Sequence, residues 1–299
     1  MPSKKIVNVA SVPKRSPFRY PGGKTWLVPL ARKWWQSRPS KPKHLIEPFA
    51  GGGIIGLTAA FEGFVEHVTF VELDPDVSAV WKCLFSDSYT SLIERILDFE
   101  VTEQNVLEIV GSEPEGIEGK AFRTIIKNRM FHGGILAPGS SLMKAGENGK
   151  GLKSRWYPKT LADRISAIGK LKHRFSIVEG DGISVLDEYR SEEDAVFFID
   201  PPYTASGKKA GSRLYRYSEI DHADLFKKAI SLEGDFLMTY DDADGVRQLA
   251  TGSKLDIELV AMKNTHHAKM EELLIGRSLL WARPESDAFR QYEFDFESE

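Results

Sequence analysis

The sequence contains a single cysteine, Cys83, among 299 residues. One thiol excludes a disulfide within the chain and a zinc site built from several cysteines. The neighbours of Cys83, in VWKCLF, are mostly apolar, which indicates an inert buried thiol. We therefore expect a reducing compartment and no metal centre.

Long apolar runs are also missing. No stretch of about 18 apolar residues occurs, and the charged N-terminal segment MPSKKIVNVASVPKRSP has no apolar run of signal-peptide length. There is no visible internal repeat or low-complexity tract. With 41% hydrophobic residues, the chain can bury a large core. We expect a soluble cytoplasmic protein that acts as a monomer or a weak dimer.

The net charge is only −3, but the basic residues are unevenly distributed. Residues 120–174 contain 13 Lys or Arg and two acids, which gives this segment a charge of +11. Residues 1–24 contain six Lys or Arg and residues 204–218 contain four, and neither segment contains an acid. Three basic segments are an electrostatic footprint for a polyanion. The alternative is a solvated basic face.

Strand-like and helix-like segments alternate at both ends of the chain, which predicts an α/β fold with a mostly parallel sheet. The insertion between the two halves, residues 86–172, is basic and predicts helices around a long loop rich in Gly, Lys and Ser. The predicted strands are HLIEPFA (44–50), HVTFVEL (67–73), FSIVEG (175–180), AVFFI (195–199), DFLMTY (235–240), LDIELVAM (255–262) and MEELLIG (270–276).

A glycine-rich turn, EPFAGGGIIG, follows the first predicted strand and opens a helix. In this context, glycine lets the main chain approach a ligand closely, although such turns are also common structural elements. Glu72 ends the next strand, where an acid can accept hydrogen bonds from ribose hydroxyls. The pattern is not GxGxxG, so a nicotinamide or flavin cofactor fits less well than another adenosine-containing one. Asp181 ends a third strand and could bind a cofactor amine or cap the following helix.

The stretch FFIDPPY ends a predicted buried strand with Asp200, Pro201, Pro202 and Tyr203. The two prolines force the chain out of the sheet, so Asp200 and Tyr203 are held where α/β sheets bind ligands. An exocyclic amine attacks a methyl group when its lone pair is withdrawn from the ring. Asp200 Oδ and the Pro201 carbonyl can withdraw the lone pair by accepting hydrogen bonds from the two N–H groups of the amine. Tyr203 can stack on a base. The alternative is a simple proline stop.

The motifs and their order resemble those of the Dam-like (D12 class, α-group) DNA N6-adenine methyltransferases. FRYPGGK (18–24) is similar to the first motif, EPFAGGG (47–53) to the cofactor loop, VELDPD (71–76) to the ribose segment and DPPY (200–203) to the catalytic motif. The resemblance implies a Rossmann-like S-adenosylmethionine-dependent methyltransferase sheet with helices on both faces, formed by residues 1–85 and 173–299. It also implies an inserted, mainly helical target-recognition domain, residues 86–172.

The resemblance also implies roles for individual residues. The expected catalytic residues are Asp200, Pro201, Pro202 and Tyr203. The expected S-adenosylmethionine-binding residues are Tyr20, Gly23, Lys24, Phe49, Gly51, Gly53, Glu72, Asp181 and Asp200.

The expected partner is double-stranded DNA. NRMFHGG (128–134) is similar to the family's recognition segment, whereas GLKSRWYPKTL (151–161) departs from the segment that accompanies GATC recognition, so a GATC target is not expected. The expected DNA-binding residues are Asn128, Arg129, Lys150, Lys153, Arg155, Trp156, Lys208, Lys209 and Arg213.

We therefore predict site-specific methylation of a flipped adenine in duplex DNA. This function is compatible with a cognate restriction nuclease or a defence-system partner. Two alternatives remain open: methylation of RNA adenine or protein glutamine, and an inactive methyltransferase fold that only binds DNA. DPPY rather than NPPY, together with the basic insert, favours DNA over a protein substrate.

Overall fold

The computed structural model describes residues 12–19, 23–146, 149–202, 220–263 and 269–283. The helices are α1 (Val28–Gln36), α2 (Ile54–Phe61), α3 (Pro75–Leu84), α4 (Tyr89–Asp98), α5 (Glu103–Gly111), α6 (Gly116–Met130), α7 (Pro158–Lys170), α8 (Gly182–Glu188), α10 (His222–Ser231) and α11 (Asp244–Gly252). The 3₁₀ helices are η1 (Lys24–Leu27), η2 (His132–Gly134), η4 (Leu152–Arg155), η5 (Lys172–Arg174) and η6 (Leu280–Ala282). The strands are β1 (His44–Glu47), β2 (His67–Glu72), β3 (Phe175–Glu179), β4 (Ala195–Ile199), β5 (Asp235–Asp241), β6 (Asp256–Lys263) and β7 (Lys269–Gly276).

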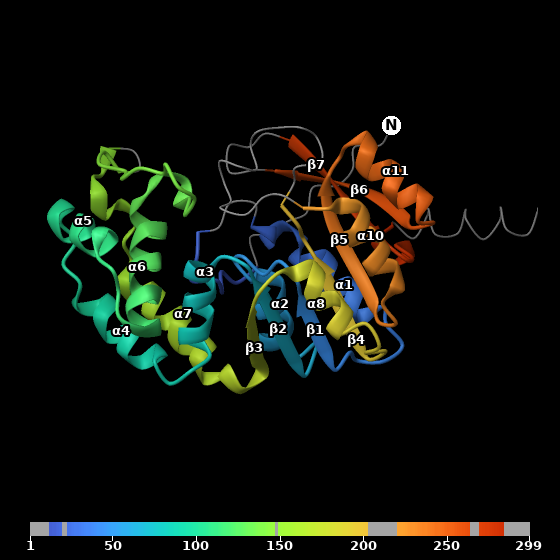
Figure 1. Ribbon diagram of the computed structural model, residues 1–299, viewed down its shortest axis with the longest axis horizontal. Helices are drawn as coiled ribbons and strands as arrows, with labels where there is room; N and C mark the ends of the chain where they lie inside the picture. The colour runs from blue at the N-terminus through green and yellow to red at the C-terminus, as the bar shows by residue number, and fades with distance from the viewer. Residues whose placement is uncertain (1–11, 20–22, 147–148, 203–219, 264–268, 284–299) are drawn as a thin grey trace, which may run out of the picture.

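In this part of the chain the strands form one seven-stranded sheet in the order β3-β2-β1-β4-β5-β7-β6 (Figure 1). Strands β1 to β5 are parallel, and β7 lies antiparallel between β5 and β6. The sheet is therefore mixed, with a parallel part and an antiparallel edge. The direction of winding reverses at β1, which pairs with β2 on one side and β4 on the other. The carboxyl ends of β1 and β4 therefore border the crevice in which such sheets bind ligands.

The β4 sequence AVFFI explains its central place in the sheet. All five residues are buried, as expected for a parallel strand covered on both faces. Val196 and Phe198 belong to the apolar core on one face, whereas Phe197 and Ile199 belong to the core on the other. Helices α2 and α3 pack on the first face, and α8, α10 and α11 lie on the second.

The chain passes from β2 into α3 through a helix cap. Asp74 accepts a hydrogen bond from the Asp76 amide at 2.9 Å, and Pro75 occupies the first turn of the helix. An N-cap acid and a first-turn proline both favour a helix start.

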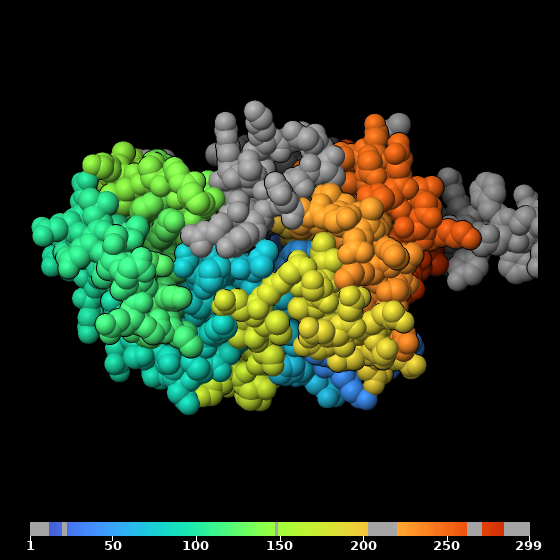
Figure 2. Space-filling view, in the orientation of Figure 1, coloured from blue at the N-terminus to red at the C-terminus, as the bar shows by residue number. Residues whose placement is uncertain are grey.

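Helices α4 to α7 lie between α3 and β3 in the sequence and gather at the end of the molecule opposite β6 and β7 (Figures 1 and 2). Helix α6 packs against α3, and α4 packs against α7. This confirms that the region is mainly helical. Its separation at residues 86–172 as a target-recognition domain stays a prediction.

We find no helix in the described ranges with the length and apolar character needed to cross a bilayer.

Candidate active site

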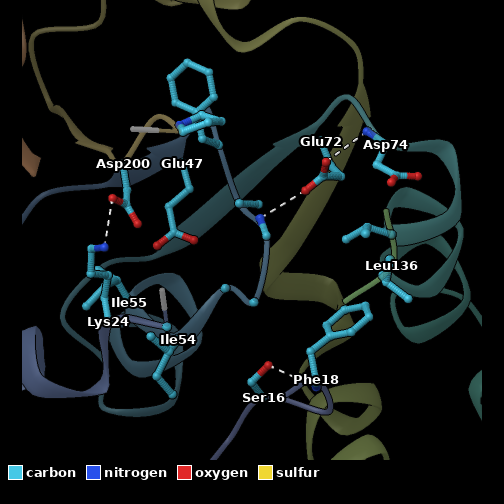
Figure 3. Close-up of a pocket in the computed structure, with 18 of the residues that line it drawn as sticks. Ser16, Phe18, Lys24, Glu47, Ile54, Ile55, Glu72, Asp74, Leu136 and Asp200 are labelled. Carbon is cyan, nitrogen blue, oxygen red and sulfur yellow. Dashed lines mark hydrogen bonds and ion pairs between the residues drawn. The ribbon is translucent and has the colours of Figure 1, made fainter. Parts of the chain in front are cut away.

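A cavity of about 490 Å³ lies at the carboxyl ends of β1, β2 and β4 (Figure 3). Its walls come from the turns after these strands, the segment before η1, and α6, α7 and the turn after η2. The lining includes ten residues expected at the catalytic or cofactor site: Gly23, Lys24, Phe49, Gly51, Gly53, Glu72, Asp181, Asp200, Pro201 and Pro202. The fold thus brings together motifs that lie far apart in the sequence.

Glycine shapes the turn between β1 and α2. Gly53 has φ +60°, and a Cβ at this position would lie 2.7 Å from Phe70 Cζ. The Gly53 amide donates to the Ala50 carbonyl at 2.7 Å, and Trp81 Nε1 donates to the Gly51 carbonyl at 3.1 Å. The turn is therefore compact, and its main chain forms part of the cavity wall.

Glu72, the last residue of β2, connects two turns. Its Oε2 accepts a hydrogen bond from the Gly51 amide at 3.0 Å, and its Oε1 accepts one from the Asp74 amide at 2.9 Å (Figure 3). Burial raises the pKa of this carboxyl to about 7, although the amide donors act in the opposite direction. Glu72 therefore fixes the turn between β1 and α2 and also lines the cavity.

Glu47, the last residue of β1, was not identified from the sequence. It is 2% exposed, and its Oε1 accepts a hydrogen bond from the Gly56 amide at 2.9 Å. Within the described part of the chain its Oε2 is buried without a hydrogen-bond partner. Burial, with a smaller contribution from the charge of Asp200 and against the effect of the Gly56 amide, raises the pKa of Glu47 to about 8. A buried carboxyl with an unsatisfied oxygen favours a ligand that brings a donor or a positive charge.

Asp200 follows β4 and is held by side chains from two other segments. Lys24 Nζ lies 3.1 Å from Asp200 Oδ1, and Thr239 Oγ1 donates to the same oxygen at 2.7 Å. Lys24 is 4% exposed, and its Nζ also lies 3.4 Å from Oε2 of Glu272 on β7. The carboxylate is thus positioned by a buried network from η1, β5 and β7.

These positions and motifs agree with a family match. Residues 20–108 match the model of the D12 class N6 adenine-specific DNA methyltransferases. This segment belongs to the D12 class.

Comparisons beyond the D12 class match give more distant similarities. A search of curated proteins finds no match. A candidate RNA methyltransferase from Pyrococcus horikoshii has 11% identity and a TM-score of 0.38, covering 91% of each chain. An rRNA methyltransferase from Streptomyces viridochromogenes has 14% identity and a TM-score of 0.37, covering 86% of each chain.

The remaining residues expected in a D12 class catalytic centre are placed in part. Pro201 and Pro202 line the cavity after Asp200. Asp181 also lines it and caps α8, accepting hydrogen bonds from the Ser184 amide at 3.0 Å and from Ser184 Oγ at 2.7 Å. The capping alternative is thus realised, and the cofactor contact of Asp181 stays a prediction. Five expected residues lie outside the described part of the chain: Tyr20, Tyr203, Lys208, Lys209 and Arg213.

Asn128 and Arg129 occupy the end of α6, where both are buried. Asn128 Oδ1 accepts a hydrogen bond from the Arg19 amide at 2.9 Å, and Asn128 Nδ2 donates to the carbonyls of Arg19 at 3.0 Å and Gly134 at 2.8 Å. Arg129 Nη2 donates to the Pro17 carbonyl. Both residues therefore hold the N-terminal segment. Base contacts by either stay predictions, and those by Asn128 would require these bonds to break.

The other expected DNA-binding residues differ in exposure. Lys150 and Lys153 are exposed and line a shallow pocket of about 300 Å³ with Lys144. Trp156 is partly buried and packs edge-on against Phe99 with a centroid distance of 5.7 Å, and its contact with DNA stays a prediction. Arg155 Nη1 donates to the Phe131 carbonyl at 3.3 Å. The exposed aromatic at the cavity rim is the next residue, Tyr157.

No group of three or more His, Cys, Asp or Glu with metal-binding geometry occurs among the residues that the structure describes.

Proposed function

We propose that the protein transfers the methyl group of S-adenosylmethionine to N6 of a flipped adenine at specific sites in duplex DNA. The observation that carries the proposal is the position of Asp200. This residue lies at the carboxyl end of β4 and is held by Lys24 and Thr239. It borders the same cavity as the glycine-rich turn between β1 and α2. The D12 class match over residues 20–108 supports the same chemistry.

The cavity residues fit S-adenosylmethionine. This cofactor carries a sulfonium and an ammonium group, and the cavity contains two buried carboxyl groups, Glu47 and Glu72. Glu47 Oε2 lacks a hydrogen-bond partner among the described residues, so a cationic ligand would satisfy a buried acceptor. Glu72, at the end of β2, is placed to accept hydrogen bonds from the ribose.

The proposed catalytic role of the chain is to orient the adenine amine. Asp200 and the Pro201 carbonyl would each accept a hydrogen bond from one N–H group of the amine. These two hydrogen bonds withdraw the nitrogen lone pair from the ring. Lys24 and Thr239 hold Asp200 Oδ1 before substrate arrives, so little reorganisation is needed. S-adenosylmethionine supplies the methyl group, and the two prolines limit movement of the accepting carbonyl.

The basic insert supports a nucleic-acid substrate. Residues 120–174 carry a charge of +11 in a chain with a net charge of −3, and Lys150 and Lys153 are exposed. Clustered cations bind phosphates and release counterions, which gives affinity without sequence information. We propose that residues 86–172 form the target-recognition domain and determine the methylated sequence.

A transfer assay tests the proposal. The protein is incubated with tritiated S-adenosylmethionine and, separately, with plasmid DNA, tRNA and a protein mixture. We expect label in DNA alone, and we expect single-molecule sequencing of DNA from expressing cells to locate N6-methyladenine in one motif. Label in tRNA or protein would identify a different substrate. DNA binding without transfer would identify an inactive methyltransferase fold.

A further inference from the structure

The cavity has a basic wall as well as an acidic one. Lys14, Arg19, Arg129 and Arg164 all line it, and they come from the segment before η1 and from helices α6 and α7. Figure 3 shows Ser16 and Phe18, which belong to that segment, across the cavity from Glu72. Basic and acidic groups therefore line the same cavity.

Arg129 is the most deeply buried member of this wall. It is 7% exposed, its Nη2 donates to the Pro17 carbonyl, and its Nε is buried without a partner in the described part of the chain. A guanidinium has five N–H donors, so one acceptor leaves most of its capacity unused. Arg164 Nη1 donates to the Ser16 carbonyl at 3.1 Å. Within the same described residues, neither arginine forms an ion pair.

The electrostatic environment disfavours an uncompensated Arg129. Burial, together with the positive charges of Arg164, Arg19 and Arg155, lowers the pKa of Arg129 to about 10. A buried cation among like charges is costly unless an anion joins it. The basic wall is therefore suited to an oxyanion that reaches into the cavity.

Two oxyanions are relevant to the proposed reaction: a DNA phosphate and the carboxylate of the cofactor's amino-acid tail. The depth of Arg129 favours the smaller group, because a duplex backbone stays at the surface. The cavity also contains Glu47 Oε2, a buried acceptor without a partner among the described residues. An amino acid carries an ammonium and a carboxylate, which match an unsatisfied carboxyl and an unsatisfied guanidinium.

We propose that Arg129, with Arg164 beside it, binds the carboxylate of the amino-acid tail of S-adenosylmethionine. This inference rests on the proposed function. It assigns a cofactor-binding role to α6 and α7, which belong to the region proposed for DNA recognition. Cofactor binding would consequently order the same helices that approach the target strand.

The experiment compares two ligands by calorimetry. One is S-adenosylhomocysteine, and the other is 5′-deoxy-5′-(3-aminopropylthio)adenosine, the same molecule without its carboxylate. The wild-type protein should prefer S-adenosylhomocysteine by roughly tenfold to hundredfold, the range for a charge-assisted hydrogen bond. In Arg129→Gln, affinity for S-adenosylhomocysteine should fall by that factor, whereas affinity for the aminopropyl compound should stay within about threefold. Arg129→Lys should retain part of the preference.

Arg95→Gln serves as the matched control, because Arg95 is a partly exposed arginine on α4 that does not line the cavity. Unchanged affinity for the aminopropyl compound shows that Arg129→Gln is folded. The inference is overturned if this variant keeps the wild-type preference for the carboxylate. It is also overturned if cofactor affinity is unchanged while DNA binding weakens and becomes less salt-dependent, since the anion would then be a phosphate. A wild-type protein that binds neither ligand would contradict the proposed function itself.

Discussion

At the scale of single residues, the cavity holds two carboxyl groups in contrasting environments. Asp200 Oδ1 contacts an ammonium at 3.1 Å and a hydroxyl at 2.7 Å. Glu47 is buried and accepts one amide hydrogen bond, at 2.9 Å. The first carboxyl is organised before any ligand binds, whereas the second has an unsatisfied oxygen. We therefore expect Asp200 to affect turnover and Glu47 to affect the response to pH.

Replacing Asp200 by Ala should reduce methyl transfer by at least ~10²-fold, the typical effect of removing one preorganised stabilising group. The fold should survive, because Asp200 follows β4 rather than packing within it. Single-turnover transfer to DNA measures the effect, and circular dichroism checks the fold. Asp187→Ala, an exposed aspartate paired with Lys228, should retain activity. Near-normal turnover of the Asp200 variant would rule out the proposed amine mechanism.

The raised pKa of Glu47, about 8, makes the cofactor-free protein sensitive to pH. The folded state keeps a proton that the unfolded chain releases above its ordinary pKa of 4.5, so stability is complete below that pH and falls as pH rises towards 8. Glu47→Gln removes this part of the decline. The melting temperatures of both proteins should fall between about pH 6 and 8. The fall should be smaller in Glu47→Gln than in the wild type, by at least about 2 °C.

Two comparisons sharpen this melting experiment. Glu72, with a pKa of about 7, contributes a decline of the same sign and is present in both proteins. Glu62 has the opposite environment, because hydrogen bonds from Arg32 and Arg15 lower its pKa. Glu62→Gln should therefore lower stability near neutral pH. It should not reduce the loss of melting temperature that occurs as the pH rises. If the melting temperatures of the wild type and Glu47→Gln change equally with pH, Glu47 is already ionised in the folded protein.

The sequence identified Asp200, Lys24 and Glu72 because each belongs to a motif with a recognisable context. It did not identify Thr239 and Glu272 as partners of the site. The role of Thr239 depends on β5 lying beside β4, and that of Glu272 on β7 lying beside β5. Local sequence patterns do not specify either pairing.

At the scale of elements, the strands and helices follow from apolar runs, caps and glycine punctuation. The predicted strands match β1 to β7 to within a few residues at their ends, because each is a short apolar or alternating run between turn residues. The antiparallel insertion of β7 between β5 and β6 was not predicted. Strand neighbours depend on packing between distant segments, and sequence periodicity reports only which residues are buried.

Gly53→Ala should destabilise the turn between β1 and α2. A left-handed conformation costs an alanine roughly 1–2 kcal/mol, and the new Cβ would meet Phe70 at 2.7 Å, which adds a further ~1–3 kcal/mol. Gly63→Ala is the matched control, since Gly63 has φ +72° and a Cβ added there would meet no atom within 4 Å. Urea unfolding measures both variants. Equal losses would show that Phe70 moves away without cost.

At the scale of the whole molecule, charge is separated along the chain. The exposed side chains of Lys150 and Lys153 lie on the helical region. The sequence shows where the basic residues are concentrated, because charge is read directly from composition. It did not reveal which basic residues are buried, and the burial of Arg129 therefore came only from the structure.

Lys150→Ala or Lys153→Ala should weaken binding to all DNA sequences alike. Each lost phosphate contact should reduce the slope of log affinity against log salt by about 0.9. Fluorescence anisotropy with two unrelated duplexes over a salt series measures the slope. Lys43→Ala, an exposed lysine next to the amino end of β1, should leave it unchanged. A change in the preferred motif without a change in slope would instead indicate a base contact.

The bonds between α6, α7 and residues 16–19 also bear on how such proteins can be recombined. Asn128, Arg129 and Arg164 all bind main-chain atoms of that segment, across more than a hundred positions of sequence. A transplanted helical region would lose these partners unless the recipient supplied a matching N-terminal strip. Chimaeras that aim to exchange target specificity should therefore carry residues 12–19 together with the helices, as one two-part cassette.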